Sequence, residues 1–278
     1  MLGGIAGDII GSVYEKANHR SKTFEPLFHA SSRFTDDTVC IVAIADAVVN
    51  NRPPVTALQD WGRRYWDNGG WGQRFALWLA DDNPQPYGSW GNGGAMRVGP
   101  AALLARSVDE ALELARYVTL VTHNHPEGVK GAEATALAIY LSRKGESVDE
   151  IRAQLSDRFA YDLSATVDEI RPQYRHSEAA HRSVPQALIC ALSATDFEDA
   201  IRNAISIGGD SDTIAAIARS AQARVRSPRP RWRPQPPTCA RLPGGLAFPI
   251  EAMKVEFMTI DSACIDNGHF KINNLLDQ

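Results

Sequence analysis

The chain has 278 residues, of which 44% are hydrophobic and 22% are charged. This is an ordinary globular composition, and the length is near the upper limit of what one hydrophobic core organises, so we expect a single domain over residues 1–278. The net charge of -4 gives no sign of a general nucleic-acid binder. The apolar start, MLGGIAGDIIGSVYE, is interrupted by Asp8 and is too short to span a bilayer, so we expect neither a signal peptide nor a membrane partner.

The cysteines are too far apart in the sequence to form a CxxC zinc or redox pair; they are Cys40, Cys190, Cys239 and Cys264. This pattern fits a reduced, cytoplasmic chain. Cys40 and Cys190 lie in apolar helical patterns, which predict buried, inert thiols.

Apolar residues recur with helical spacing, and no alternating strand pattern with hairpin turns is present, so we expect an all-α fold. In chain order, the pattern predicts helices over residues 2–15, 38–49, 55–80 (one or two helices), 95–106, 109–122, 129–143, 147–159, 184–192, 197–206 and 213–222. Between them we expect irregular chain at 18–34, a turn-rich loop at 81–94, a break at 123–128 and irregular chain at 160–183.

Residues 219–243 have a different composition, because they are rich in arginine and proline. Proline forbids a regular helix there, so the tract is expected to be a solvated loop or a partly disordered segment. The alternative is a polyproline-type arm or an arm that binds an anionic ligand. Apolar helical character returns at 246–258.

Two acidic clusters are the most informative feature of the sequence. They are TDDT at 35–38 and GGDSDT at 208–213, and a small, apolar helix is expected directly after each. Adjacent carboxylates repel one another, and one helix dipole of about half a charge does not neutralise two of them, whereas a divalent cation would. Asp210 and Asp212 are two positions apart and cannot share a helical face, so they converge only if the backbone is extended or looped.

The ligand types in these clusters favour particular ions. The clusters offer carboxylate and hydroxyl oxygens without His or Cys, which favours Mg²⁺ or Mn²⁺ over Zn²⁺. Four carboxylates exceed what a single Mg²⁺ normally takes from a protein, whereas two ions about 3.5–4 Å apart would balance them. The alternative is that Asp and Thr serve only as helix N-caps, the commoner role of either cluster alone. The presence of both clusters favours the metal site.

The sequence resembles the ADP-ribosylglycohydrolase family, which includes hydrolases that remove ADP-ribose from arginine or serine, and related lens crystallins. The resemblance runs from Leu2 to about Ala218 and rests on separate blocks in the family's order: GGIAGDIIGSVYE, FTDDT, GSWGNGGAMR, THNHPEG, SVPQAL and GGDSDT. It implies an all-α bundle with two Mg²⁺ or Mn²⁺ ions at the centre of a cleft.

The resemblance also implies roles for individual residues. The metal ligands would be Thr35, Asp36, Asp37, Asp210, Asp212 and Thr213. The candidate catalytic residues are Glu15, which matches a glutamate that positions or activates the attacking water, and Asp36. The segment that wraps the ADP-ribose would contain Gly88, Ser89, Trp90, Gly91, Asn92 and Gly93. His123 matches a histidine near the substrate phosphates or ribose.

Taken without the resemblance, several of these residues have simpler interpretations. Glu15 alone is typical of a solvated helix residue at the end of the first helix. The glycine-rich loop can bring backbone N–H groups close to a pyrophosphate, but it is also typical of a plain turn. Trp90 could stack on adenine or ribose, or could equally anchor in the core. His123 and His125 alone would be structural or exposed, and Asp8 could support the site from behind the ligands.

The chain departs from the family pattern in three places. Arg219 stands where a small residue is usual, and the tract at 219–243 replaces a short Tyr-Gly motif, as a local change of reading frame would do. Residues 180–182 precede SVPQAL where a Gly-containing turn is usual. From Gly244 onward the similarity is loose. These departures concern the packing behind Asp210 and Asp212 more than the ligands themselves.

The sequence therefore predicts a metal-dependent hydrolase that cleaves an ADP-ribosyl glycosidic bond, with ADP-ribose or an ADP-ribosylated protein as its partner. The linkage, to arginine, serine or another group, stays open, as does the choice between Mg²⁺ and Mn²⁺. One alternative is a non-catalytic ADP-ribose-binding or crystallin-like structural protein, against which the complete ligand set argues. Another is a two-metal phosphohydrolase, against which the lack of histidine ligands and the GSWGNGG loop argue.

Overall fold

The computed structural model describes residues 1–68 and 70–222, together with the backbone of residues 265–266 and 269–270. Contacts divide the chain into two compact units, Gly3–Val225 and Arg226–Gln278. Of the second unit, the structure describes only two antiparallel strands, β1 (Ile265–Asp266) and β2 (His269–Phe270). Residues 223–243 of the arginine- and proline-rich tract and the helix expected at 246–258 lie outside the described residues. The expectation of a single domain stays a prediction.

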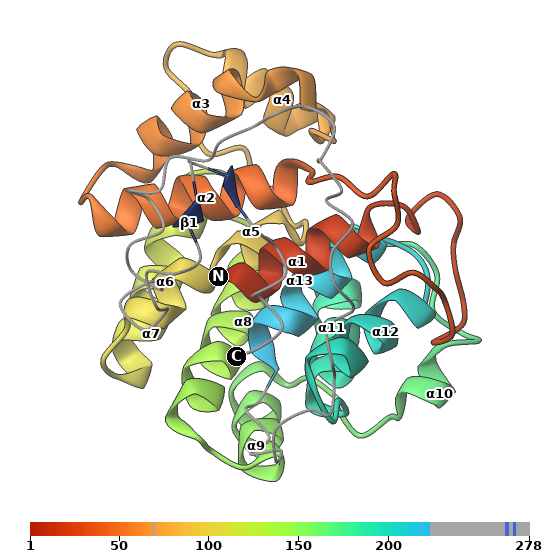
Figure 1. Ribbon diagram of the computed structural model, residues 1–278. Helices are drawn as coiled ribbons and strands as arrows, with labels where there is room; N and C mark the ends of the chain where they lie inside the picture. Colours follow the sequence, from red (N-terminus) through yellow and green to blue (C-terminus); the bar gives the residue numbers. More distant parts are fainter. Residues whose placement is uncertain (69, 223–264, 267–268, 271–278) are drawn as a thin grey trace. The chain divides into compact units, whose positions relative to one another are not determined.

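The first unit is built from helices, which confirms the all-α expectation (Figure 1). They are α1 (Leu2–Gly11), α2 (Asp36–Val49), α3 (Pro54–Arg64), the 3₁₀ helix η1 (Trp66–Asn68), α4 (Gln73–Ala80), α5 (Gly93–Arg97), α6 (Gly99–Leu104), α7 (Val108–Thr119), α8 (Pro126–Lys144), α9 (Val148–Phe159), α10 (Val167–Ile170), α11 (Ala180–Leu192), α12 (Phe197–Ser206) and α13 (Ser211–Ala221). None of the helices in the described part of the chain is long and apolar enough to cross a membrane.

Some helix boundaries differ from those predicted. The first helix ends at Gly11 and gives way to turns, so Glu15 lies in a turn and not at a helix end. The helix predicted at 95–106 is two helices, α5 and α6, and α5 begins at Gly93, inside the predicted loop. Helix α11 begins at Ala180, before the predicted start, because the N–H of Ala180 donates to the carbonyl of Trp90 at 3.0 Å.

Helix α8 forms the centre of the first unit, where it contacts α5, α6, α7, α9, α11 and α13. It is buried almost continuously from Gly131 to Ser142, which explains why its apolar residues surround the helix and do not form one stripe. Its many alanines let neighbouring helices approach closely. The thiols of Cys40 and Cys190 are also buried, and burial raises the pKa of the Cys190 thiol to about 12, as the prediction of inert cysteines requires.

Glycines on one face of α1 let it pack directly against α13. A Cβ atom on Gly4 would lie 2.6 Å from Ser220 Oγ, and one on Gly11 would lie 2.6 Å from both Asp212 Cα and the carbonyl oxygen of Ser211. Real Cβ atoms essentially never approach other atoms so closely, so glycine is required for this backbone contact. The glycine-rich start therefore places the last turn of α1 against the first turn of α13, at the second acidic cluster.

Candidate active site

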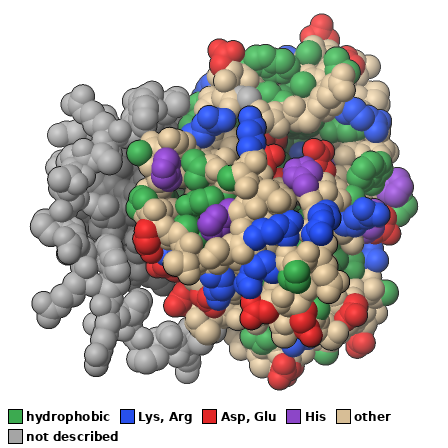
Figure 2. All heavy atoms as spheres, turned by 90° about the vertical axis from the view of Figure 1, so that its right-hand side faces the viewer, with side chains coloured by type: hydrophobic (Ala, Val, Ile, Leu, Met, Phe, Trp, Pro, Cys, Tyr) green, Lys and Arg blue, Asp and Glu red, His purple; other side chains and the backbone are tan. Residues whose placement is uncertain are grey.

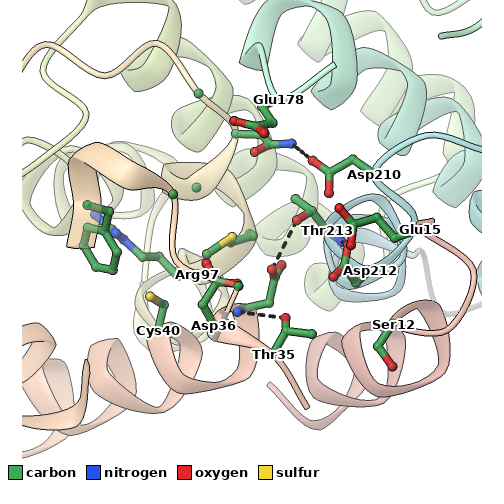
Figure 3. Close-up of a pocket in the computed structure, with 18 of the residues that line it drawn as sticks. Ser12, Glu15, Thr35, Asp36, Cys40, Arg97, Glu178, Asp210, Asp212 and Thr213 are labelled. Atoms are coloured by element: carbon green, nitrogen blue, oxygen red, sulfur yellow. Dashed lines mark hydrogen bonds between the residues drawn. The ribbon is translucent and has the colours of Figure 1, made fainter. Parts of the chain in front are cut away.

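A cleft of about 870 Å³ collects the residues that the sequence predicts for the site. The acidic residues come from the turn after α1 and from the beginnings of α2 and α13, and the loop before α5 faces them (Figure 3). The predicted residues that line the cleft are Glu15, Thr35, Asp36, Asp37, Ser89, Trp90, Gly91, Asn92, Gly93, His123, Asp210, Asp212 and Thr213. Gly88 is not among the lining residues; it has a φ of +69° and its N–H donates to Asn124 Oδ1 at 2.6 Å.

Asp8 caps the beginning of α2 from a different helix. Its carboxylate accepts hydrogen bonds from the N–H of Thr35 at 2.9 Å, from Thr35 Oγ1 at 2.7 Å, from the N–H of Thr38 at 3.1 Å and from Thr38 Oγ1. Thr35 is the N-cap residue of α2, and its Oγ1 accepts from the N–H of Asp37 at 3.3 Å, so Asp8 and Thr35 together satisfy the backbone donors at the beginning of this helix. Asp8 thus leaves both carboxylates of the first motif available to the cleft, which goes beyond the minor supporting role that the sequence indicated for it.

The second motif begins in a left-handed turn. Gly208 and Gly209 have φ values of +72° and +79°, and the N–H of Gly209 donates to Asn18 Oδ1 at 3.1 Å. Asp210 is the N-cap residue of α13, with ψ of 70°, whereas Asp212 lies in the first helical turn. This change of backbone at Asp210 lets the two carboxylates converge, as the two-residue spacing requires.

The acidic side chains from these segments meet at two places. Carboxylate oxygens of Glu15, Asp210 and Asp212 lie within 4.8 Å of one another, and so do those of Asp8, Asp37 and Asp212. Asp212 belongs to both groups, so the two places adjoin. Figure 3 shows Glu15, Asp210, Asp212 and Thr213 gathered on one side of the cleft.

Asp36 lies outside these two groups in the structure. Its side chain is half-buried at the cleft wall, and a Cβ on Gly70 would lie 2.5 Å from its Oδ1. Gly70 has a φ of +86°, which favours glycine at this position. The backbone at Gly70 therefore limits where the Asp36 carboxylate can move.

Burial and mutual repulsion disfavour the charged form of these carboxyl groups. Burial and then the charge of Asp212 raise the pKa of Asp8 to about 7, and burial raises the pKa of Asp210 to about 6. Burial, followed by the charges of Asp210 and Glu15, raises the pKa of Asp212 to about 8. For Asp37, burial and then the charges of Asp8 and Asp212 raise the pKa well above its usual value.

The donor set fits hard divalent cations. Oδ1 of Asp37 is buried and has no hydrogen-bond partner among the described residues. No lysine or arginine in the described part of the chain forms an ion pair with the acidic groups of the cleft. A cation bound among these oxygens would satisfy the buried lone pair and offset the repulsion. These clusters could hold metal.

The glycine-rich loop is joined to residues 178–180, which sequence reasoning did not assign to the site. The N–H of Asn92 donates to the carbonyl of Glu178 at 2.7 Å, and Gly91 pairs with Ala179 in an antiparallel bridge. Asn92 also donates through Nδ2 to Asp210 Oδ2 at 2.7 Å, so this loop orients a carboxylate of the second motif.

The loop amides are less available to a ligand than the sequence suggested. The N–H groups of Gly88 and Asn92 donate to Asn124 and Glu178, that of Ser89 donates to the carbonyl of Thr122 at 3.3 Å, and that of Gly91 donates to Ser89 Oγ at 3.3 Å. A diphosphate would have to break these bonds or meet other groups of the cleft. Trp90 is 50% exposed, so its indole is not a core anchor and can offer a stacking face.

His123 lies in the wall of the cleft beside Arg97, a buried residue that the sequence did not assign to the site. It is 6% exposed and neighbours the buried residues Thr122 and Arg97, whereas His125 is an exposed N-cap of α8. The signal for Arg97 was a charge inside the apolar run GGAMRVGPAALL, where a solvated arginine would be out of place.

Basic side chains stand beside the acidic groups. Lys16, Arg33 and Arg74 line the cleft and are exposed. On the face of the molecule in Figure 2, lysine and arginine side chains gather in a band beside acidic and histidine side chains. Because Lys16, Arg33 and Arg74 line the same cleft as the carboxylates, the cleft offers both acidic groups and a basic rim, which suits a ligand with hydroxyl and phosphate groups.

Comparison with known proteins establishes the family. Residues 1–219 match the family model described as ADP-ribosylglycohydrolase, so the chain belongs to the ADP-ribosylglycohydrolase family. A solved structure titled "ADP-ribosylglycohydrolase-related protein complex" superposes with a TM-score of 0.63 at 22% sequence identity, over 80% of this chain and 84% of that chain. This likeness shows that the fold is shared.

Relatives with named activities match this chain at 24% to 30% sequence identity. ADP-ribosylhydrolase ARH3 of Homo sapiens is 30% identical over 176 residues, which is 47% of this chain and 48% of that protein. The ARH3 of Danio rerio is 28% identical, with the same shares. This chain therefore spans about half the length of these two relatives. ADP-ribosylarginine hydrolase Tri1 of Pseudomonas putida is 24% identical over 251 residues, 78% of this chain and 67% of that protein.

Proposed function

We propose that this protein hydrolyses an ADP-ribosyl glycosidic bond with the help of divalent cations bound in the acidic cleft. The observation that carries the proposal is the convergence of carboxylate oxygens from Glu15, Asp210 and Asp212, within 4.8 Å, beside those of Asp8 and Asp37. The family and the names of its relatives support the substrate class.

Two adjacent groups of oxygens would hold the ions. Asp210 and Asp212 would serve one, and Asp37 and Asp212 the other, with the Thr35 and Thr213 hydroxyls and Asp36 close by. Mg²⁺ or Mn²⁺ bound there would supply Lewis-acid polarisation and a fixed template for the hydroxyls of the distal ribose. The donors are oxygens throughout, which supports these ions over Zn²⁺.

Glu15 is placed to activate the attacking water as a general base. It is half-buried in a turn, and its carboxylate oxygen lies within 4.8 Å of those of Asp210 and Asp212, so it can accept a proton from a water molecule held beside them. The water oxygen bonds to the anomeric carbon as the bond to the protein side chain breaks, and a proton goes to the leaving nitrogen or oxygen. The products are ADP-ribose and the unmodified side chain, and the transition state is oxocarbenium-like.

The other walls of the cleft suit the rest of the substrate. The exposed face of Trp90 can stack on an adenine or a ribose, and the basic rim at Lys16, Arg33 and Arg74 can attract a diphosphate. A non-catalytic ADP-ribose-binding or crystallin-like protein would need the same walls but not the buried, mutually repelling carboxylates. Their energetic cost without a cation supports a metal site, and with it a metal-assisted reaction.

One assay separates the alternatives. Protein freed of metal with a chelator is incubated with peptides ADP-ribosylated on arginine or on serine, and then with added Mg²⁺, Mn²⁺ or Zn²⁺. We expect release of intact ADP-ribose with Mg²⁺ or Mn²⁺, little with Zn²⁺, and none without metal. Binding without any turnover would indicate the structural alternative, release of AMP would indicate a phosphohydrolase, and full activity without metal would contradict the metal site.

A further inference from the structure

Arg97 is a buried cation in the wall of the cleft. Its side chain is 1% exposed, and in the described part of the chain no carboxylate forms an ion pair with it. Figure 3 shows Arg97 and Cys40 across the cleft from Glu15, Asp210 and Asp212. The guanidinium lies 5.8 Å from the ring centre of Phe75, and Nη2 donates to Thr122 Oγ1 at 2.6 Å. Burying a charged guanidinium with so few polar partners is energetically costly, which indicates a role other than packing.

Thr122 links Arg97 to His123, because its hydroxyl contacts both side chains. Its side chain is fully buried, and Oγ1 lies 2.8 Å from Nδ1 of His123. Arginine is only a donor, so Thr122 Oγ1 must accept from Arg97. The hydroxyl hydrogen then needs an acceptor, and Nδ1 is the one acceptor for it among the described residues. A proton on Nδ1 would leave the buried hydroxyl hydrogen without a partner, which is costly.

The other ring nitrogen of His123 faces the glycine-rich loop. A Cβ on Gly93 would lie 3.0 Å from Nε2, and one on Gly91 would lie 3.7 Å from it. Burial, followed by the positive charge of Arg97, lowers the pKa of His123 well below its usual value, so the ring is neutral. A neutral ring that accepts at Nδ1 carries its proton on Nε2. Gly93 and Gly91 leave space beside this donor at the cleft wall.

We propose that Arg97 and Thr122 are positioning residues that hold His123 as the neutral Nε2–H tautomer, so that it donates a hydrogen bond to an oxygen of the ligand in the cleft. The identity of that ligand as an ADP-ribosyl group rests on the proposed function, whereas the tautomer does not. Since the donor is neutral, its contribution to ligand affinity stays constant across the range in which an ordinary histidine titrates, about pH 6 to pH 8.

Nitrogen-15 NMR of the full chain labelled at histidine tests the tautomer directly. The His123 signals are identified by their loss in His123→Gln. We expect Nε2 protonated and Nδ1 unprotonated in the wild-type protein, with no titration between about pH 6 and pH 8. A wild-type spectrum with the proton on Nδ1, or with both nitrogens protonated in this range, would overturn the proposal without any variant.

Thr122→Val tests the positioning role, because it replaces the hydroxyl with a methyl group of similar size. We expect a mixture of tautomers and a roughly tenfold loss of ADP-ribose affinity by calorimetry, the scale of one hydrogen bond. Thr122→Ser should restore both. Thr119→Val is the matched control, because Thr119 is also fully buried but its Oγ1 has no partner among the described residues. An unchanged tautomer in Thr122→Val, or equal effects of both valine variants on it, would contradict the role of Thr122.

These measurements also separate this proposal from the proposed function. The spectra need neither metal nor substrate. If His123 shows the expected tautomer but ADP-ribose does not bind, the proposed substrate is wrong and the role of Arg97 and Thr122 stands. If ADP-ribosylated peptides are hydrolysed while wild-type His123 carries its proton on Nδ1, the proposed function stands and this inference fails.

Discussion

The hydroxyl of Thr213 donates a hydrogen bond to Asp37 Oδ2 at 3.2 Å, and it thereby joins two acidic motifs that are 176 positions apart in the chain. The bond links the first turn of α13 to the first turn of α2. The carboxylates at the beginnings of the two helices therefore lie in one electrostatic environment. A substitution at one helix start changes the charges that act on the carboxylates at the other.

Asp212→Asn should remove the metal site and leave the fold intact. Asp212 belongs to both groups of converging oxygens, so its loss affects any ion bound in either. The amide has nearly the same shape and removes one of the charges that raise the pKa of Asp8 and Asp37. We expect Mg²⁺-dependent activity to fall at least about 100-fold, since even indirect support of a metal site is worth roughly 10–100-fold. The melting temperature without metal should be unchanged or higher.

Asp109→Asn is the control for this variant, because Asp109 is exposed in the first turn of α7 and does not line the cleft. Its activity and its response to Mg²⁺ should match those of the wild-type protein. If Asp212→Asn kept wild-type activity and wild-type stabilisation by Mg²⁺, the assignment of Asp212 as a ligand would be wrong.

The stability of the metal-free protein should fall as pH rises from about 5.5 to about 8. The pKa values of Asp8, Asp210 and Asp212 are raised from 3.8 to about 7, about 6 and about 8 in the folded chain. Between these values and 3.8 the folded state binds more protons than the unfolded state, so the free energy of unfolding decreases with rising pH. The effect is complete once pH exceeds the folded pKa values. Thermal melts in the presence of a chelator measure this slope.

Added Mg²⁺ should act in the opposite direction. Metal binds the ionised carboxylates, so its stabilising effect grows with pH. At a concentration of about 100 times the dissociation constant it amounts to about 2.7 kcal/mol, or roughly 5–10 °C in melting temperature for a domain of this size. The Mg²⁺ shift should be largest near pH 8 and small near pH 5.5. A shift that is equal at both pH values would show that the ion binds elsewhere.

The helices were predictable where local signals determine them. The second helix was expected because TDDT precedes an apolar run, and α12 begins and ends where predicted, at Phe197 and Ser206. Predicted helix boundaries were wrong where contacts with distant segments of the chain determine where a helix begins. Helix α11 begins at Ala180 because the strand-like pairing of Gly91 with Ala179 orders the chain before it, and no local pattern reports that contact.

The site was predictable in its acidic residues but not in the groups that hold them. Paired aspartates before small helices are visible in the sequence. The hydrogen bonds that Asp8 accepts from the N–H groups of Thr35 and Thr38 depend on how α1 packs against α2, which the sequence does not reveal. Glu178 also lines the cleft, and its carbonyl accepts a hydrogen bond from the N–H of Asn92; any residue type could provide that carbonyl, so no local pattern reports it.

Glu15→Gln should lower turnover far more than it lowers ADP-ribose binding. The amide keeps the shape of the side chain but cannot accept a proton from water, so we expect turnover to fall roughly 10²–10⁴-fold, the range of general acid–base assistance. Single-turnover kinetics gives the rate and calorimetry the affinity. If ADP-ribose binding were lost in parallel with the rate, Glu15 would be a substrate-binding residue and would not activate the attacking water.

Gly11→Ala should damage both stability and metal binding, because its methyl group would press α1 away from the second acidic motif. The new Cβ would lie 2.6 Å from Asp212 Cα and from the carbonyl oxygen of Ser211, so backbone must move. Overpacking of this kind costs about 1–3 kcal/mol, or roughly 2–12 °C in melting temperature at this chain length.

The control is Gly99→Ala, whose Cβ would meet nothing closer than Ser220 Oγ at 3.8 Å. Both glycines are buried at the ends of helices. Gly99 precedes Pro100, which disfavours a helical backbone for a residue with a Cβ, so this control carries a local cost of its own but no clash with a neighbouring helix. We expect Gly99→Ala to lose less stability than Gly11→Ala, with an unchanged response to Mg²⁺. In Gly11→Ala a higher Mg²⁺ concentration should be needed for half-maximal stabilisation, because Asp212 moves away from Glu15 and Asp210. Equal melting temperatures and equal Mg²⁺ responses in the two variants would show that α1 can yield without disturbing the carboxylates, and the direct contact would then not position the site.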